Sequence, residues 1–288
     1  MLGERCNRGA SSPLSDRPVQ AESESLGSMG TILDAIVAAR KQDLAAARRQ
    51  VPEEELLQRL VQAAPVRPFA QSLAQAPFPG IIAEVKRRSP SAGVLQDHLA
   101  ADRQARAYAA GGATCISVLT ESRHFAGSLH DLSLVRQTVS LPLLRKDFIV
   151  DPYQILEARV WGADAILLIA EILDGAQLVE LVAYARRLGM DALVEFHEPQ
   201  QLDKVLASGA HLIGINNRNL HTFHTDIGHT LALAPAIPGD RLLVSESGIR
   251  SAEDIRRLAQ VGVRAFLVGE ALVRAPDPTA WLLSLRCA

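Results

Sequence analysis

The sequence predicts an α/β fold, a single (β/α)8 TIM barrel with an N-terminal helical extension. Eight short apolar runs follow residue 78, and their starts are roughly 20–35 residues apart, about the length of one βα unit. Stretches with a helical pattern lie between the runs, and several end in a glycine suited to closing a helix, as in AGGAT, WGADA, ASGAH and VGVRA. Eight such units without a long interruption are enough to close a barrel of about 250 residues.

The predicted strands are the apolar runs at residues 81–86, 114–119, 141–146, 164–169, 191–196, 211–216, 241–246 and 264–269. Two further helices are expected before the first strand, at residues 31–49 and 53–63, where they would cap the bottom of the barrel or flank its mouth. An open, doubly wound sheet is the competing fold. It is disfavoured because no G-x-G-x-x-G motif follows the first strand.

The expected domain organisation is a disordered tail at residues 1–28 and the barrel at residues 29–288, with the N-terminal helices at about 31–63. Residues 1–28 are rich in Ser, Gly, Pro and charge, and they lack the apolar centre of a signal peptide.

Composition argues against several classes of function. The formal net charge is −2, so bulk charge does not drive binding to nucleic acid or to an anionic membrane. No apolar run reaches the ~18 residues that would span a membrane. Cys6, Cys115 and Cys287 show no CxxC or Cys/His spacing, so neither a disulfide framework nor a metal site is indicated. We therefore expect a cytoplasmic protein that binds no metal, nucleic acid or membrane.

Polar residues end several of the predicted strands. Because alternate strand residues face the inside of a barrel, the first strand would direct Ile82, Glu84 and Lys86 inward. Four other strands follow the same order, with apolar residues first and a polar residue at the carboxyl end: Lys146, Glu195, Asn216 and Glu246. The carboxyl ends of barrel strands converge where the active sites of barrel enzymes lie. We interpret these residues as one cluster whose mutual pairing tunes their pKa values for proton transfer.

A single charged residue at a strand end is more often part of a structural ion pair than a catalytic group. Here three glutamates and two lysines fall on the same predicted face of the barrel. Their number favours the catalytic interpretation.

Two glycines lie where the last two strands turn toward a helix, Gly248 in SESGI and Gly269 in FLVGEAL. Glycine permits close approach of a ligand to the backbone, and a helix start offers N–H donors. The loops after the seventh and eighth strands form the recurrent phosphate site of such barrels. Either glycine alone could be a simple turn residue, but the pair predicts a phosphate site.

The chain resembles the indole-3-glycerol-phosphate synthase family in stretches distributed over all eight predicted strands. In chain order these are IIAEVKRRSPSAG, ISVLTE, LRKDFIVDPYQI, ADAILLIAEIL, LVEFHE, IGINNRNL, VSESGI and FLVGEALVR. The helical lead TILDAIVAARKQDL resembles the N-terminal extension of the family. The resemblance therefore covers about residues 31 to 275 and leaves out residues 1–28.

This resemblance implies a carbon–carbon lyase of tryptophan biosynthesis that uses no metal or organic cofactor. The family converts 1-(2-carboxyphenylamino)-1-deoxyribulose 5-phosphate to indole-3-glycerol phosphate, and carbon dioxide and water leave. An acid must protonate the ketone oxygen while an aromatic carbon attacks the ketone. A further acid–base pair must then remove the hydroxyl group as water.

The resemblance also implies a role for each site residue. Lys146 resembles the general acid, Glu195 its partner in the dehydration, Glu84 the carboxylate that works with them, and Lys86 the lysine that holds the substrate anion. The other positions are polar ligands and supports (Asn216, Arg218), the ESG stretch with Glu246 orienting polar groups (Glu246, Ser247), a contact in the loop after the first strand (Ser89), the apolar wall for the anthranilate ring (Phe125, Phe148, Leu167) and the phosphate clamp (Gly248, Gly269 and the N–H of Glu270).

Two positions depart from common forms of the family. Ala92 stands where many members carry Lys or another residue. Glu270 follows Gly269 where some members carry Ser, so a hydroxyl contact to phosphate would be lost while a backbone donor is kept.

Two alternatives to this function are another phosphate-binding barrel enzyme and a non-catalytic barrel subunit. A phosphoribosylanthranilate isomerase would need a Cys/Asp pair, whereas the first strand here carries Glu84 and Lys86. A thiazole-phosphate synthase is a further candidate of the same kind. A non-catalytic subunit is disfavoured because all the expected site residues are present. We expect a monomer that binds a small phosphorylated molecule, with a weak homo-oligomer as the alternative.

Overall fold

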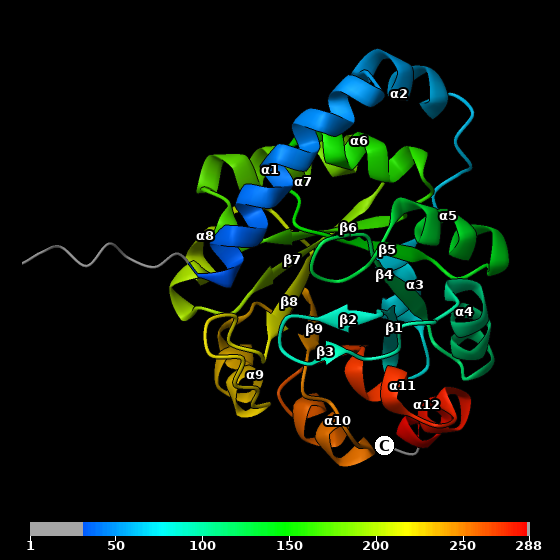
Figure 1. Ribbon diagram of the computed structural model, residues 1–288. Helices are drawn as coiled ribbons and strands as arrows, with labels where there is room; N and C mark the ends of the chain where they lie inside the picture. The colour runs from blue at the N-terminus through cyan, green and yellow to red at the C-terminus, as the bar shows by residue number, and fades with distance from the viewer. Residues whose placement is uncertain (1–30, 287–288) are drawn as a thin grey trace, which may run out of the picture. The chain divides into compact units, whose positions relative to one another are not determined.

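The computed structural model describes residues 31–286. Within this range, parallel strands close into a barrel in the order β1-β10-β9-β8-β7-β6-β5-β4, and β4 pairs with β1. Figure 1 shows the barrel strands surrounded by helices. The barrel strands are β1 (Gly80–Val85), β4 (Cys115–Leu119), β5 (Leu143–Lys146), β6 (Ala165–Ile169), β7 (Asp191–Phe196), β8 (Leu212–Asn216), β9 (Leu242–Glu246) and β10 (Ala265–Val268). The predicted TIM barrel is confirmed, and the predicted tail at residues 1–28 lies outside the described residues.

The helices cover the outside of the barrel, and three of them precede its first strand in the chain. They are α1 (Ile32–Gln50), α2 (Glu53–Leu60), α3 (Phe69–Gln75), α4 (Ala101–Ala110), α5 (Leu129–Thr138), α6 (Pro152–Val160), α7 (Gly175–Arg187), α8 (Leu202–Ala207), α9 (Gly228–Leu233), α10 (Ala252–Ala259), α11 (Glu270–Arg274) and α12 (Pro278–Leu285), with short 3-10 helices at Ala170–Ile172, Pro199–Gln201 and Ala234–Ala236. Within residues 31–286, none of the helices is long and apolar enough to cross a membrane.

Several helix starts are fixed by their own sequence. At α1 the side chains of Thr31 and Asp34 each accept a hydrogen bond from the other residue's backbone, which is a capping box. Ser251 and Asp254 form the same arrangement at α10. These local bonds satisfy N–H groups that the first turn of a helix leaves without a partner.

The barrel separates two apolar layers because strand side chains alternate between its faces. Ile82, Leu144 and Leu193 belong to the cluster inside the barrel. Ile81 and Ile166, each adjacent in sequence to an inward-facing position, belong to the cluster between the strands and the helices. The alternation predicted from the sequence is therefore confirmed, and it places the polar strand ends in one layer above the inner cluster.

Two elements were not predicted. Helix α3 closes the bottom of the barrel, because Phe69 and Leu73 join the inner cluster and the Leu73 backbone lies next to Gly80 at the start of β1. A seven-residue helix carries too short a pattern to be recognised. The loop after β1 also contains a small hairpin of β2 (Arg88–Ser89) and β3 (Gly93–Val94), paired antiparallel.

Helix α1 is tied to the barrel by ion pairs. Arg40 contacts the carboxylate of Asp147, which follows β5, at 2.9 Å, and the Asp147 side chain is fully buried. Asp147 also accepts hydrogen bonds from Thr120 and Arg145. Burial by itself raises the pKa of Asp147, but Arg145 and Arg40 outweigh it and the pKa is lowered.

We expect Arg40→Ala to lower the free energy of unfolding by about 1–3 kcal/mol, since a buried carboxylate loses a charged hydrogen-bond partner. Urea denaturation followed by circular dichroism would measure this loss. Arg106→Ala is the matched control, because Arg106 pairs with Asp102 on an exposed helix face. Its effect should stay below about 1 kcal/mol, and equal losses in the two variants would contradict the prediction.

Candidate active site

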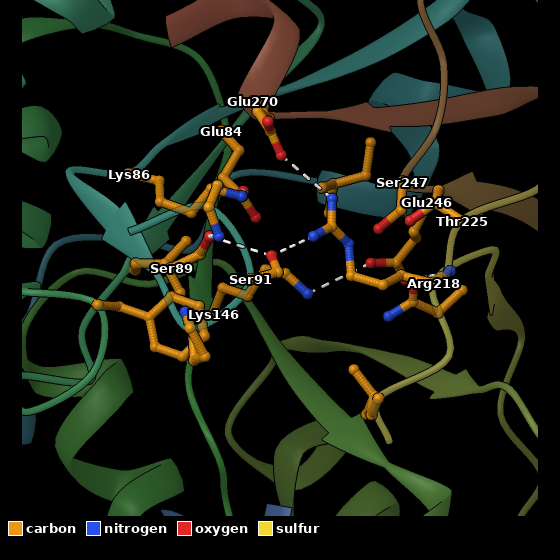
Figure 2. Close-up of a pocket in the computed structure, with 18 of the residues that line it drawn as sticks. Glu84, Lys86, Ser89, Ser91, Lys146, Arg218, Thr225, Glu246, Ser247 and Glu270 are labelled. Carbon is orange, nitrogen blue, oxygen red and sulfur yellow. Dashed lines mark hydrogen bonds and ion pairs between the residues drawn. The ribbon is translucent and has the colours of Figure 1, made fainter. Parts of the chain in front are cut away.

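A cavity of about 760 Å³ lies at the carboxyl ends of the barrel strands, below the start of α1 and beside the β2–β3 hairpin. Figure 2 shows polar side chains from several strands and loops directed toward one another in this cavity. Every residue of the predicted site lines it: Glu84, Lys86, Ser89, Phe125, Lys146, Phe148, Leu167, Glu195, Asn216, Arg218, Glu246, Ser247, Gly248, Gly269 and Glu270. The structure thus brings the candidates together, while their chemical roles stay predictions.

Lys146 lies at the centre of the polar layer. Its Nζ is 3.0 Å from Glu195 Oε2 and 3.3 Å from Glu246 Oε2, so the ends of β5, β7 and β9 meet at one ammonium group. The other oxygen of Glu195, Oε1, accepts a hydrogen bond of 3.0 Å from Asn216 Nδ2 at the end of β8. Glu195 is therefore held by a cation on one oxygen and by an amide on the other.

The pKa values of the three titratable groups in this cluster shift in different directions. Burial alone would lower the pKa of Lys146, but the negative charges of Glu195, Glu246 and Glu84 outweigh burial and raise it. Burial would raise the pKa of Glu195, yet Lys146, Glu246 and Asn216 stabilise its anion and lower the pKa. Burial, together with repulsion from Glu195, raises the pKa of Glu246 well above its usual value. Of the two carboxyl groups that contact Lys146, Glu246 therefore holds a proton more readily than Glu195 does.

The raised pKa of Glu246 predicts that Glu246→Gln is a mild substitution, with kcat lowered less than about tenfold, since an amide resembles a protonated carboxyl group. A carboxyl group whose pKa is raised in the folded state stabilises the protein fully below its unfolded pKa, near 4.5, and that contribution is lost as the pH rises. The thermal stability of Glu246→Gln relative to wild type should therefore increase with pH above about 5. Melting curves at several pH values would show this trend, and a trend of opposite sign would contradict a raised pKa for Glu246.

Two glycines make room for the buried carboxyl groups. A Cβ atom at Gly269 would overlap the carboxylate of Glu84 and would lie 3.0 Å from Lys86 Nζ. A Cβ atom at Gly214, in β8, would overlap the carboxyl group of Glu246. Glu84 and Lys86 form an ion pair, with the Glu84 side chain 2 % exposed. Gly269 therefore has a steric function besides the phosphate contact predicted for it.

We expect Gly269→Ala to lower kcat/KM by about 10²-fold or more, because the added methyl group displaces the Glu84–Lys86 pair from the cavity. Steady-state kinetics would measure the loss. Gly239→Ala is the matched control, since a Cβ atom there has no neighbour within 4 Å, and its kinetics should be unchanged. If Gly269→Ala had the same kinetics as wild type, the packing of Glu84 against Gly269 would have no effect on catalysis, which would contradict the prediction.

A chain of polar contacts crosses the other side of the cavity, as Figure 2 shows. Arg218, after β8, donates to Ser91 in the β2–β3 hairpin and lies 3.1 Å from the carboxylate of Glu270. Glu270 in turn contacts Arg274 at 3.1 Å. Ser89 contacts Ser91 at 3.3 Å, which joins the predicted substrate contact to this chain. Glu270 thus presents both a backbone N–H and a carboxylate to the region of the predicted phosphate clamp.

The turn after β9 has an unusual backbone. Ser247 (φ 65°) and Gly248 (φ 79°) both lie in the left-handed region, which is sparsely populated for a residue other than glycine. Two cations that were not predicted, Arg250 and Arg274, also line the cavity, and Arg274 is paired with Glu270. Phosphate binding at this end of the cavity stays a prediction.

An apolar wall faces the polar layer. The rings of Phe125 and Phe148 lie 6.0 Å apart, and Leu167 lines the same cavity. Glu121, fully buried, fixes the loop that carries Phe125: its carboxylate accepts hydrogen bonds from the backbone N–H groups of residues 123–125.

The sequence interpretation missed part of the lining. From α1 come Ile32, Leu33 and Ile36, and from the loop after β8 come Leu220, Phe223 and Thr225. The apolar face of α1 was visible as a helical pattern, but the pattern did not say which surface it covers. Within residues 31–286, no group of three or more His, Cys, Asp or Glu side chains is arranged to hold a metal ion.

Known proteins resemble this chain in sequence and in fold. A family model described as indole-3-glycerol phosphate synthase matches residues 33–285. An indole-3-glycerol phosphate synthase of Rhodopirellula baltica is 51% identical over 249 residues, which cover 86% of this chain and 96% of the relative. One of Burkholderia vietnamiensis is 48% identical over 257 residues, which cover 88% and 98%.

Solved structures of low sequence identity share the barrel. A 3-hexulose-6-phosphate synthase from Salmonella typhimurium aligns with a TM-score of 0.59 at 14% identity and covers 72% of this chain and 97% of that one. A thiamine phosphate pyrophosphorylase from Pyrococcus furiosus aligns with a TM-score of 0.55 at 14% identity, with coverages of 76% and 96%. At such identity these matches support the fold alone.

Proposed function

The chain belongs to the indole-3-glycerol phosphate synthase family, and from this premise we propose how its cavity performs the ring closure. The activity is that of a decarboxylating lyase of tryptophan biosynthesis. It converts 1-(2-carboxyphenylamino)-1-deoxyribulose 5-phosphate to indole-3-glycerol phosphate, releasing carbon dioxide and water. The observation that carries the assignment of roles is the position of Lys146 between Glu195 and Glu246 at the rim of the cavity.

Lys146 is the general acid of the condensation. A carbon of the anthranilate ring attacks the ketone carbon, a carbon–carbon bond forms, and the ketone oxygen takes a proton from the Lys146 ammonium group. The carboxylate on the attacking carbon then leaves as carbon dioxide, and its bonding electrons restore the aromatic ring. Because the pKa of Lys146 is raised, the acid is fully protonated at neutral pH.

Glu195 acts in the dehydration. The hydroxyl group made in the first step leaves as water after it receives a proton, while a base removes a proton from the neighbouring carbon. The lowered pKa of Glu195 keeps its carboxylate ionised, as a base requires. Asn216 fixes the orientation of that carboxylate, and the raised pKa of Glu246 limits the negative charge beside it.

The ends of the cavity hold the two ends of the substrate. Lys86, paired with Glu84, supplies a cation for the carboxylate that is lost as carbon dioxide. Phe125, Phe148 and Leu167 supply an apolar surface for the anthranilate ring. The phosphate binds at the turn of Gly248 and at Gly269, with backbone donors that include the Glu270 N–H. Ser89, Arg218 and Ser247 supply polar contacts between the two ends.

The experiment that tests this function is a fluorescence assay for indole-3-glycerol phosphate, starting from the synthetic anilino-ribulose phosphate. Product should form at the same rate with and without a metal chelator. No product from the folded protein would overturn the function, and product formed only without chelator would overturn the expectation of a metal-free reaction.

We further propose that the protein acts as a monomer in the cytoplasm, where the tryptophan pathway would supply its substrate. Gel filtration with light scattering would test the first part, since a mass twice that of the chain would contradict it.

A further inference from the structure

His197 occupies a junction that the reaction does not use directly. It follows β7, two residues after Glu195, and its ring contacts the end of β8 and the loop that continues from it. This loop, residues 217–227, supplies Arg218, Leu220, Phe223 and Thr225 to the cavity lining. His197 thus connects β7, which carries the proposed base Glu195, to the loop of residues 217–227, which forms one wall of the cavity.

The hydrogen bonds of His197 require one N–H and one lone pair. Its Nδ1 lies 2.7 Å from the backbone carbonyl oxygen of Asn216, which can only accept, so Nδ1 carries the proton. Its Nε2 lies 3.2 Å from Asn219 Nδ2 and accepts a hydrogen bond from that amide. The ring is therefore neutral in this arrangement.

The orientation of the Asn219 amide is fixed independently of His197. Asn219 Oδ1 accepts hydrogen bonds of 2.9 Å from the backbone N–H groups of His221 and Thr222. Its Nδ2 must consequently face His197, because a flipped amide would direct N–H groups at both backbone donors. A second proton on the His197 ring would place N–H against N–H and break the contact between the ring and the loop.

The surroundings of the ring are partly buried and rich in titratable groups. His229 of α9 stacks on His197 with ring centroids 4.2 Å apart, and its Nε2 donates to the His197 carbonyl oxygen at 2.6 Å. Burial lowers the pKa of His229. The carboxylate of Glu171, after β6, accepts the backbone N–H groups of His197 and Glu198. The other charged groups near the stacked pair are Glu195, Glu198 and Asp226.

We propose that His197 is a positioning residue, whose neutral ring holds residues 217–227 so that Arg218 is directed into the cavity. The inference rests on the proposed function for its kinetic consequence. Arg218 contacts bound substrate rather than the reacting atoms, so loss of the positioning raises KM more than it lowers kcat.

Three substitutions separate the two hydrogen bonds. His197→Ala removes both, His197→Gln places an amide oxygen near the position of Nε2 and keeps the bond to Asn219, and His197→Asn places an amide nitrogen near the position of Nδ1 and keeps the bond to Asn216. None of the three titrates near neutral pH. His211→Ala is the matched control, because His211 is an exposed histidine at the opposite end of the barrel, just before β8.

We expect His197→Ala to raise KM by about tenfold at pH 7.5, with kcat within about threefold of wild type. A change of this size corresponds to the loss of roughly one buried hydrogen bond. His197→Gln should return KM to within about threefold of wild type, whereas His197→Asn should not. If kcat fell as much as KM rose in His197→Ala, or if KM were the same in all three variants, the proposal would be overturned.

Hydrogen–deuterium exchange gives a readout that does not depend on activity. Amide exchange within residues 217–227 should accelerate in His197→Ala and should stay slow in His197→Gln and His211→Ala. If wild type makes no product, the proposed function fails while the exchange result still decides the role of His197. Unchanged exchange in His197→Ala would overturn that role even in an active enzyme.

Discussion

Lys146→Ala is expected to lower kcat by at least about 10³-fold while the barrel stays folded. The substitution removes the proposed proton donor, and a positioned acid or base contributes 10²–10⁴-fold in typical enzymes. It also removes the cation shared by Glu195 and Glu246, so the charge balance of the reacting region changes at the same time. The fold survives because Glu195 can take up a proton once its cation is gone.

Single-turnover rates at saturating substrate would measure this effect, with circular dichroism to verify the fold. Lys41→Ala is the matched control, because Lys41 is exposed on α1 and lies outside the cavity lining. Its rate should equal that of wild type. A folded Lys146→Ala variant with a rate within tenfold of wild type would exclude Lys146 as the general acid.

Glu195→Gln is expected to lower kcat by about 10²–10³-fold with a smaller change in KM. The amide keeps the shape of the carboxylate but cannot accept a proton, so the dehydration loses its base. Lys146 also loses its nearest anionic partner, at 3.0 Å. Because the change affects a group that acts in the transition state, it should appear in kcat and kcat/KM to a similar extent.

The comparison with Glu246→Gln makes this prediction specific. Both glutamates contact Lys146, but the pKa of Glu195 is lowered and that of Glu246 is raised, so the same chemical change should be more severe at position 195 than at position 246. Glu180→Gln, on the exposed face of α7, is the control for the substitution itself. Equal losses at positions 195 and 246 would mean that the two carboxyl groups share the base function.

The barrel and most of its site could be predicted because their pattern is local and periodic. Alternation along β1, β5 and β7 places Glu84, Lys146 and Glu195 on the inner face without any knowledge of distant contacts. Parallel closure of the sheet then brings these strand ends to the same rim. The resemblance to a known family added individual positions in loops, such as Ser89 and Arg218, that alternation does not specify.

What could not be predicted depends on contacts between distant segments. The apolar face of α1 shows that the helix is buried, but nothing local indicates that Leu33 and Ile36 line the cavity. The pKa values of Glu195 and Glu246 diverge because of their different neighbours, although the two residues look alike in sequence. The space that Gly214 and Gly269 leave for carboxyl groups is likewise a property of adjacent strands in the barrel.

The most direct test is a crystal structure of the protein with indole-3-glycerol phosphate bound. The phosphate should lie at the turn of Gly248 and at Gly269, and the indole ring should pack on Phe148 and Leu167. Lys146 and Glu195 should lie beside the indole carbon atoms at which the ring was closed and water was eliminated. The account would be contradicted if the phosphate of the product lay beside Phe148, or if Lys146 and Glu195 did not contact the indole ring.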